Sequence, residues 1–247
     1  MISYRFKRRA FLTAGDPSLD RTVTAAAQLE QAGVDVLELG VPFSDPLADG
    51  PVIQRSSERA LERGTTLATV LEAVRRIRRT TALPLLLFSY YNPLLRHGLA
   101  RLAAEAREAG VDGVLVTDLP PEEAGPWLEA ARPCALDTVF LAAPTSPDDR
   151  LHRVAEASRG FVYAVSRTGV TGERQSLSDD ARPLVERLRA RTAVPVALGF
   201  GISTPEQVSQ AAAVADGVVV GSALVRFLED HPEGDLAGQV RWLKSAT

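Results

Sequence analysis

Eight short and almost continuously apolar runs are the feature that most limits how this chain can fold. Between the runs, apolar residues return every three or four positions, which is the period of an amphipathic helix. A run without polar alternation is typical of a strand buried on both faces, so each run predicts a strand and each interval a helix. The eight runs span residues 10–14, 34–39, 84–89, 113–118, 138–143, 161–166, 195–200 and 217–222.

A weak internal repeat supports this pattern of alternating strands and helices. Three segments share a helix end, an aspartate and a strand: AGVDVLELG, AGVDGVLVTD and AVADGVVVGS. Repeated strand–helix units predict a parallel sheet, either open or closed into a barrel. Eight units in about 250 residues match the (βα)8 barrel, or TIM barrel. Because no Pro- or Ser-rich linker divides the chain, we predict an α/β protein with one barrel domain over residues 1–247.

Composition and charge exclude several classes of function. The formal net charge of −3 gives no basic footprint for nucleic acid or an anionic membrane, and the basic segment Tyr4–Arg9 is expected to be a solvated N-terminus. The single cysteine, Cys134, cannot form an internal disulfide. No apolar stretch approaches the roughly 18 residues that cross a bilayer, and the N-terminus lacks the apolar part of a secretory signal. We therefore expect a cytoplasmic protein.

Three acids follow the second run, in the stretch ELGVPFSDPLADGP. The active site of a (βα)8 barrel lies at the carboxyl ends of its strands, and a carboxyl buried there has a raised pKa that suits proton transfer. Glu38 is such a carboxyl if its side chain points into the barrel; if it points outward, it is a salt-bridge partner of a helix. Asp49 lies in a loop stiffened by prolines and can accept a hydrogen bond from a substrate N–H group. Asp45 could equally cap a turn.

Glycine-rich segments follow three later runs. GFGIST and GSAL bring glycine and small polar residues to points where a strand leads into a helix, and helix-start amides attract anions. Barrels often bind phosphate after strands seven and eight, so we predict a phosphate site at Gly201, Gly221 and Ser222, with ordinary turn glycines as the alternative. SRTGVTGE, after the sixth run, reads either as a loop that closes over substrate or as a surface loop.

Missing residues exclude other mechanisms. A Schiff-base aldolase needs a lysine inside the barrel, whereas Lys7 precedes the first run and Lys244 lies in the last helical segment. A metal-dependent aldolase needs clustered ligands, whereas His97, His152 and His231 fall in a loop, a helix and the tail. No G-x-S-x-G nucleophile motif occurs. We therefore expect carboxylate acid–base catalysis on a phosphorylated substrate, without metal or cofactor.

At its motifs the chain resembles the tryptophan synthase alpha subunit family. The resemblance covers most of the chain and runs through FLTAGDP, ELGVPFSDPLADGP, YYNP, DLPPEE, APTSPDDR, YAVSRTGVTG, GFGIST and GSALV. It implies a (βα)8 barrel and retro-aldol cleavage of indole-3-glycerol phosphate to indole and glyceraldehyde 3-phosphate. It also implies a place in the biosynthesis of tryptophan, an aromatic amino acid.

The resemblance implies roles for particular residues. Glu38 stands at the position of the family's general acid–base, and Asp49 at that of the carboxylate that holds the indole N–H. Tyr163 matches the tyrosine near the reacting carbons. The remaining matches are to pocket-wall, closing-loop and phosphate-contacting positions, at Phe11, Leu115, Thr171, Gly172, Gly201, Gly221 and Ser222.

The resemblance also implies a partner. The family works with a beta subunit that uses pyridoxal phosphate, in an alpha2beta2 heterotetramer, and indole passes between the subunits. The segments that resemble its docking face are Asp45 and Tyr90–Pro93, although both could equally be structural.

The chain departs from the family before its first strand. Only about ten residues precede the first run, where the family usually has an additional helix, so we expect a shortened N-terminal region. The family's usual proline before FLTAGDP is also replaced, with Arg9 and Ala10 at this point. Two alternatives stay open: a stand-alone indole-releasing lyase of secondary metabolism, and an inactive barrel that activates a partner.

Overall fold

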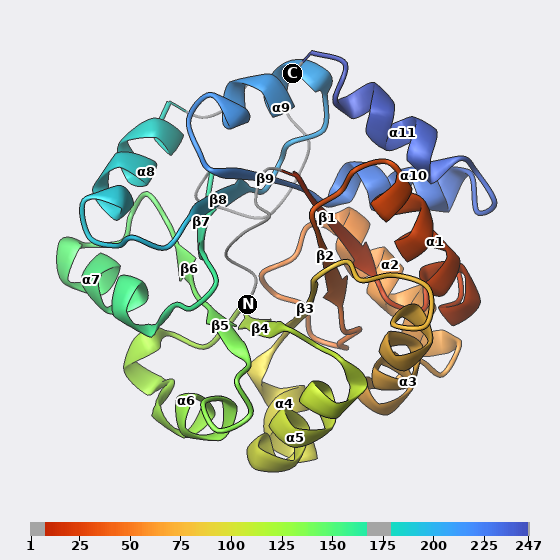
Figure 1. Cartoon of the computed structure of the whole chain (residues 1–247), viewed down its shortest axis with the longest axis horizontal. Helices are drawn as coiled ribbons and strands as arrows, with labels where there is room; N and C mark the ends of the chain where they lie inside the picture. The colour runs from red at the N-terminus through yellow and green to blue at the C-terminus, as the bar shows by residue number, and fades with distance from the viewer. Residues whose placement is uncertain (1–7, 167–178, 247) are drawn as a thin grey trace.

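The computed structural model describes residues 8–166 and 179–246. It is a barrel of parallel strands with helices around it (Figure 1). The expectation of a shortened N-terminal region falls on residues 1–7, outside the described residues. The strands are β1 (Arg8–Thr13), β2 (Val36–Gly40), β3 (Leu85–Ser89), β4 (Gly113–Val116), β5 (Asp137–Val139), β6 (Leu141–Ala142), β7 (Val162–Val165), β8 (Val196–Gly199) and β9 (Gly217–Val220).

Helices follow the strands and cover the outside of the barrel (Figure 1). Several begin at capping residues: Thr66 and Thr204 both form capping boxes, which satisfy the first free amides of the helix. No helix within the described ranges is long and apolar enough to cross a membrane. The helices are α1 (Leu19–Gln31), α2 (Pro51–Glu62), α3 (Leu67–Ile77), α4 (Tyr91–His97), α5 (Leu99–Ala109), the 3-10 helix η2 (Pro121–Glu123), α6 (Gly125–Ala131), α7 (Asp148–Ala157), α8 (Ala181–Arg189), α9 (Pro205–Ala212), α10 (Ser222–Asp230) and α11 (Leu236–Leu243).

The predicted (βα)8 architecture is confirmed, with one difference in the fifth strand. The sheet order is β5-β4-β3-β2-β1-β9-β8-β7-β6, and all pairs are parallel. The fifth apolar run is divided at Phe140 into β5, which pairs with β4, and β6, which pairs with β7. The Phe140 carbonyl, between them, accepts a hydrogen bond from Tyr163 N at 3.0 Å. The fifth run therefore connects β5 and β6, the two end strands of the sheet.

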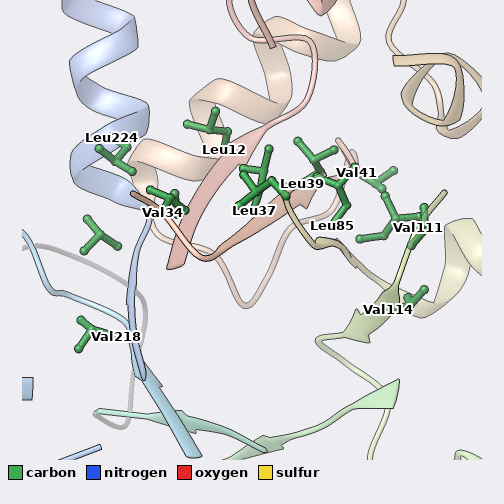
Figure 2. Close-up of a cluster of buried hydrophobic side chains, with 14 of the residues drawn as sticks. Leu12, Val34, Leu37, Leu39, Val41, Leu85, Val111, Val114, Val218 and Leu224 are labelled. Atoms are coloured by element: carbon green, nitrogen blue, oxygen red, sulfur yellow. The ribbon is translucent and has the colours of Figure 1, made fainter. Parts of the chain in front are cut away.

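Strand alternation divides the buried side chains into an outer and an inner cluster. On β2, Leu37 and Leu39 belong to the outer cluster, which packs between the sheet and the helices (Figure 2). Val36 belongs to the inner cluster, inside the barrel. Because successive side chains of a strand point to opposite faces, Glu38 shares the inward face with Val36.

The repeat noted in the sequence has a structural cause at the amino ends of the strands. In each copy the aspartate carboxylate accepts a hydrogen bond from the first backbone amide of the strand before it, which ties neighbouring strands together. An arginine side chain also contacts each carboxylate, at 3.2, 2.5 and 2.7 Å in chain order. The amide pairs, each at 2.9 Å, are Asp35 with Arg8, Asp112 with Leu85 and Asp216 with Val196.

We predict that Asp112→Ala lowers the free energy of unfolding by about 2–4 kcal/mol, because it leaves the Leu85 amide and the Arg78 guanidinium without this acceptor. Urea denaturation followed by circular dichroism measures the change. Asp20→Ala is the control: its ion pair with Arg76 has an equally short distance, 2.6 Å, but Asp20 is 82% exposed, so we expect a loss of at most about 1 kcal/mol. Equal losses in the two variants would contradict the assignment.

Candidate active site

Six of the residues predicted from the sequence line one small cavity of about 40 Å3. Asp49 comes from the loop after β2, and Gly201 and Gly221 follow β8 and β9, so the cavity lies at the carboxyl ends of the strands. The six predicted residues are Phe11, Asp49, Tyr163, Gly201, Gly221 and Ser222. The other lining residues are Ile53, Phe88, Phe200, Ile202 and Val219.

Glu38 is fully buried inside the barrel and does not itself line this cavity. Its Oε1 lies 3.5 Å from Nε of Arg9, whose side chain is also fully buried. Neither carboxylate oxygen has a hydrogen-bond donor among the described residues. Burial raises the pKa of Glu38 to about 7, and the Arg9 charge opposes this rise. Glu38 therefore exchanges its proton near neutral pH.

Asp49 is held by Tyr90, which lies in the YYNP segment that the sequence left open as either a docking face or a structural segment. Oη of Tyr90 donates to Oδ2 of Asp49 at 2.9 Å and accepts from the Ala48 amide at 3.0 Å. Burial raises the pKa of Asp49 to about 6, while the Tyr90 hydrogen bond lowers it. Burial and the neighbouring carboxylate raise the pKa of Tyr90, so the phenol stays a donor. Asp49 is thus a rigid carboxylate that is largely ionised at neutral pH.

Aromatic rings form one wall of the cavity. The ring of Tyr163 lies edge-on to Phe200, with centroids 5.5 Å apart, and to Phe88, at 6.4 Å. Phe88 in turn meets Phe11 at 5.2 Å. Burial, and next the charge of Glu38, raise the pKa of Tyr163 well above its usual value, so its hydroxyl is neutral. The Tyr163 side chain packs so closely against Gly199 that a Cβ atom at position 199 would clash with it.

Backbone and small polar groups that follow β8 and β9 also line the cavity. Helix α10 begins at Ser222, and Gly221 before it provides no side-chain cap. The first amides of a helix have no partner within the helix, so this end of α10 favours an anion. Gly201 adopts a φ of +81°, which favours glycine, and lets the chain turn tightly beside the cavity.

Other predicted residues lie elsewhere. Leu115 belongs to the inner cluster but does not line the cavity. Thr171 and Gly172 lie outside the described residues. Asp45 is exposed, and its Oδ2 accepts from the Ser44 hydroxyl at 2.5 Å.

Sequence analysis missed two features of the site. The expectation of a solvated N-terminal basic segment is wrong for Arg9, because β1 begins two residues earlier than the apolar run and carries Arg9 into the barrel. The contact of Tyr90 with Asp49 had no signal beyond the YYNP motif, since it joins residues 41 positions apart.

The arrangement combines two kinds of chemistry. Glu38 and Asp49 have pKa values of about 7 and about 6, which suit a proton-transfer group and a charge-stabilising carboxylate. The aromatic wall suits a planar apolar ring, and the start of α10 suits an anion. Together they fit a substrate that carries both an aromatic ring and an anionic group.

We predict that Asp49→Asn stabilises the protein at neutral pH by about 1–3 kcal/mol. The folded-state pKa of Asp49 is raised to about 6, so the folded chain holds this proton more tightly than the unfolded chain does. The wild type therefore loses stability as pH rises from about 4 to about 6, whereas the variant lacks this loss. Urea denaturation at several pH values should show a gain for the variant at pH 7 that vanishes near pH 4.

Asp45→Asn is the control, because it removes one charge from the exposed part of the same loop. A destabilised Asp49→Asn protein at pH 7 would instead mean that the Asp49 charge supports the fold.

Comparison with known proteins shows the family of this chain. Residues 7–245 match the sequence model of the family described as tryptophan synthase alpha chain. The tryptophan synthase alpha chain of Solibacter usitatus is 57% identical over 224 residues, 91% of this chain and 84% of that protein. That of Geobacter sulfurreducens is 52% identical over 236 residues, which are 96% of this chain and 89% of that protein.

Solved structures give the same result. A structure of Mycobacterium tuberculosis tryptophan synthase superposes with a TM-score of 0.91 and 40% identity, covering 98% of this chain and 92% of that one. A chain of the tryptophan synthase α2β2 complex from Pyrococcus furiosus gives a TM-score of 0.90 and 40% identity, covering 98% of both chains. The sequence matches extend over nearly the whole length and the barrel superposes on the solved relatives, so the chain belongs to the tryptophan synthase alpha chain family.

Proposed function

We propose that the chain is the alpha subunit of tryptophan synthase and cleaves indole-3-glycerol phosphate to indole and glyceraldehyde 3-phosphate. The observation that carries this proposal is the pair of buried carboxyls at the carboxyl end of the barrel, with pKa values raised to about 7 and about 6. The chain belongs to the tryptophan synthase alpha chain family, and its cavity also has an aromatic wall and a helix start that suits an anion.

Glu38 is the proton shuttle in this proposal. Its protonated carboxyl gives a proton to indole C3 and then takes the proton of the hydroxyl on the carbon bonded to C3. The C–C bond breaks, its electron pair returns to the ring, and the hydroxyl carbon becomes the aldehyde of glyceraldehyde 3-phosphate. Glu38 ends protonated as it began, and a pKa near 7 suits a group that must both give and take a proton.

Asp49 supplies charge in the same step. Protonation of C3 leaves positive charge on the ring, and an ionised carboxylate at the ring N–H stabilises it. The Tyr90 hydrogen bond fixes Oδ2 of Asp49, so no energy is spent on turning the carboxylate during the reaction. Tyr163, a neutral phenol on the aromatic wall, stands beside the reacting carbons.

The substrate phosphate binds at the start of α10. Gly221 and Ser222 present backbone amides and a hydroxyl there, and Gly201 lines the same cavity. We assign Thr171 and Gly172 to the same substrate site from the family resemblance alone. The cavity of about 40 Å3 is small for an indole ring, so we expect side chains that line it to move when the substrate binds.

A beta subunit is the proposed partner, in an α2β2 assembly in the cytoplasm. Support comes from the solved relatives, whose chains come from tryptophan synthase and its α2β2 complex. The loop after β2 offers an exposed apolar residue, Leu47, which is 87% exposed beside Asp45. Exposed large apolar side chains at such a loop suit a docking face.

We predict that Glu38→Gln lowers the rate of indole release at least about 100-fold, because the amide cannot transfer a proton. The amide also leaves the Arg9 charge without its carboxylate, so the assay is run where circular dichroism shows the variant folded. Glu108→Gln, the same change on the exposed face of α5, is the control and should keep wild-type activity. Unchanged indole release in the Glu38 variant would refute the proton-shuttle assignment.

We predict that adding a tryptophan synthase beta subunit raises indole formation from indole-3-glycerol phosphate severalfold or more. High turnover by the chain alone, without stimulation, would identify a stand-alone lyase. Stimulation of the beta reaction with no cleavage by this chain would identify an inactive barrel that activates its partner.

A further inference from the structure

An arginine lies inside the barrel next to the proposed proton shuttle. Arg9 is 2% exposed, and its side chain is fully buried. On β1, Ala10 and Leu12 belong to the outer cluster and Phe11 to the inner one, so alternation points Arg9 inward. The register aligns Arg9 with Val36 and Phe11 with Glu38, which sets Arg9 one layer below Glu38, toward the amino ends of the strands.

The contacts of the guanidinium in this layer include an aromatic ring and the Glu38 carboxylate. Its central carbon lies 3.3 Å from the centroid of the Phe161 ring, within the range of a cation–π interaction. Its Nε lies 3.5 Å from Oε1 of Glu38. Burying a guanidinium is costly unless an opposite charge lies close by, and an apolar side chain at this position would avoid that cost. A role in setting the proton affinity of Glu38 would explain why a charged side chain is found at this position.

The charges around Glu38 make the direction of that effect clear. The titratable groups that act on it directly are Arg9 from β1 and Tyr163 from β7, whereas Asp49 from the loop after β2 acts on Tyr163. Tyr163 is neutral, because burial and the charge of Glu38 raise its pKa. Arg9 therefore provides the positive charge that opposes the loss of hydration at Glu38.

We propose that Arg9 is a positioning residue of the lyase reaction, whose buried guanidinium holds the Glu38 carboxyl in the barrel centre and sets its proton affinity. The proposal rests on the proposed function for the catalytic consequence only; the effect on Glu38 is measurable without catalysis. Without the arginine, Glu38 would keep its proton to higher pH and would be a weaker acid toward indole C3. Glu38 would then no longer be able to give a proton to indole C3 and take one from the substrate hydroxyl equally well near neutral pH.

The direct test is a pH titration of the Glu38 carboxyl by NMR, in protein labelled with carbon-13 at the glutamate carboxyls. The Glu38 signal is assigned by its loss in Glu38→Gln. We expect Arg9→Met to raise the Glu38 midpoint by at least about one pH unit, because an opposite charge within about 4–6 Å typically moves a carboxyl pKa by 1–3 units. Arg9→Lys, which keeps the charge, should move it less.

Arg8→Met is the matched control. Arg8 is the neighbour of Arg9 on β1, but its side chain is 43% exposed and pairs with Asp35 at the barrel surface. This variant should leave the Glu38 midpoint where it is in the wild type. A wild-type midpoint in Arg9→Met, or equal shifts in the Arg8 and Arg9 variants, would overturn the proposal.

A second measurement uses the unmodified chain, so the test survives if Arg9→Met does not fold. The Nε–H resonance of Arg9 should titrate with the same midpoint as the Glu38 carboxyl. An Arg9 resonance that does not respond to pH across that midpoint would also overturn the proposal.

Kinetics separate this proposal from the proposed function. In Arg9→Met, the pH profile of indole release should move upward with the Glu38 midpoint, while KM stays within about twofold because Arg9 lies below the substrate layer. If Glu38→Gln keeps wild-type activity but the NMR shift occurs, the proposed function fails and the Arg9–Glu38 coupling stands. If Glu38→Gln is inactive and no shift occurs, the coupling fails alone.

Discussion

The removal of water from two carboxyl groups is the interaction on which the rest of this site depends. Glu38 lies in the barrel interior, where every neighbouring strand contributes apolar side chains, and Asp49 is a buried residue of the loop that follows β2. Loss of hydration raises both pKa values toward neutrality. Burial makes an ionised carboxylate unfavourable in the folded protein. The same burial raises its pKa into the range in which it can exchange a proton near neutral pH.

The barrel provides this environment through strand alternation. One face of each strand packs against helices and forms the larger outer cluster, whereas the other face fills the barrel. Function is concentrated on the inner face and stability on the outer face and at the amino ends, where aspartates tie adjacent strands together. The carboxyl ends are therefore free to carry polar residues and tight turns that add little to the fold.

Much of this organisation could be predicted from the sequence, and the omissions have a common cause. The eight apolar runs predict the barrel because strand and helix periods are local properties. The positions of Asp49, Gly201 and Ser222 follow from their places after strands. The roles of Arg9 and Tyr90 depend instead on partners 29 and 41 residues away, which no local pattern encodes. Arg9 also sits in a basic segment, which by composition alone resembles a solvated terminus.

The pairing of β1 with β9 has a consequence for the order in which this chain folds. Arg8 is aligned with Val218, so the ring closes between segments from opposite ends of the chain, at the greatest entropic cost of any strand pair. Neighbouring pairs such as β3–β4 join segments much closer in sequence and form with less loss of chain freedom. Because β1 carries Arg9, the pairing of β1 with β9 is one of the steps that remove water from its guanidinium. The cost of removing water from the guanidinium therefore falls in part on this strand pairing. We expect that cost to slow the closure of the barrel.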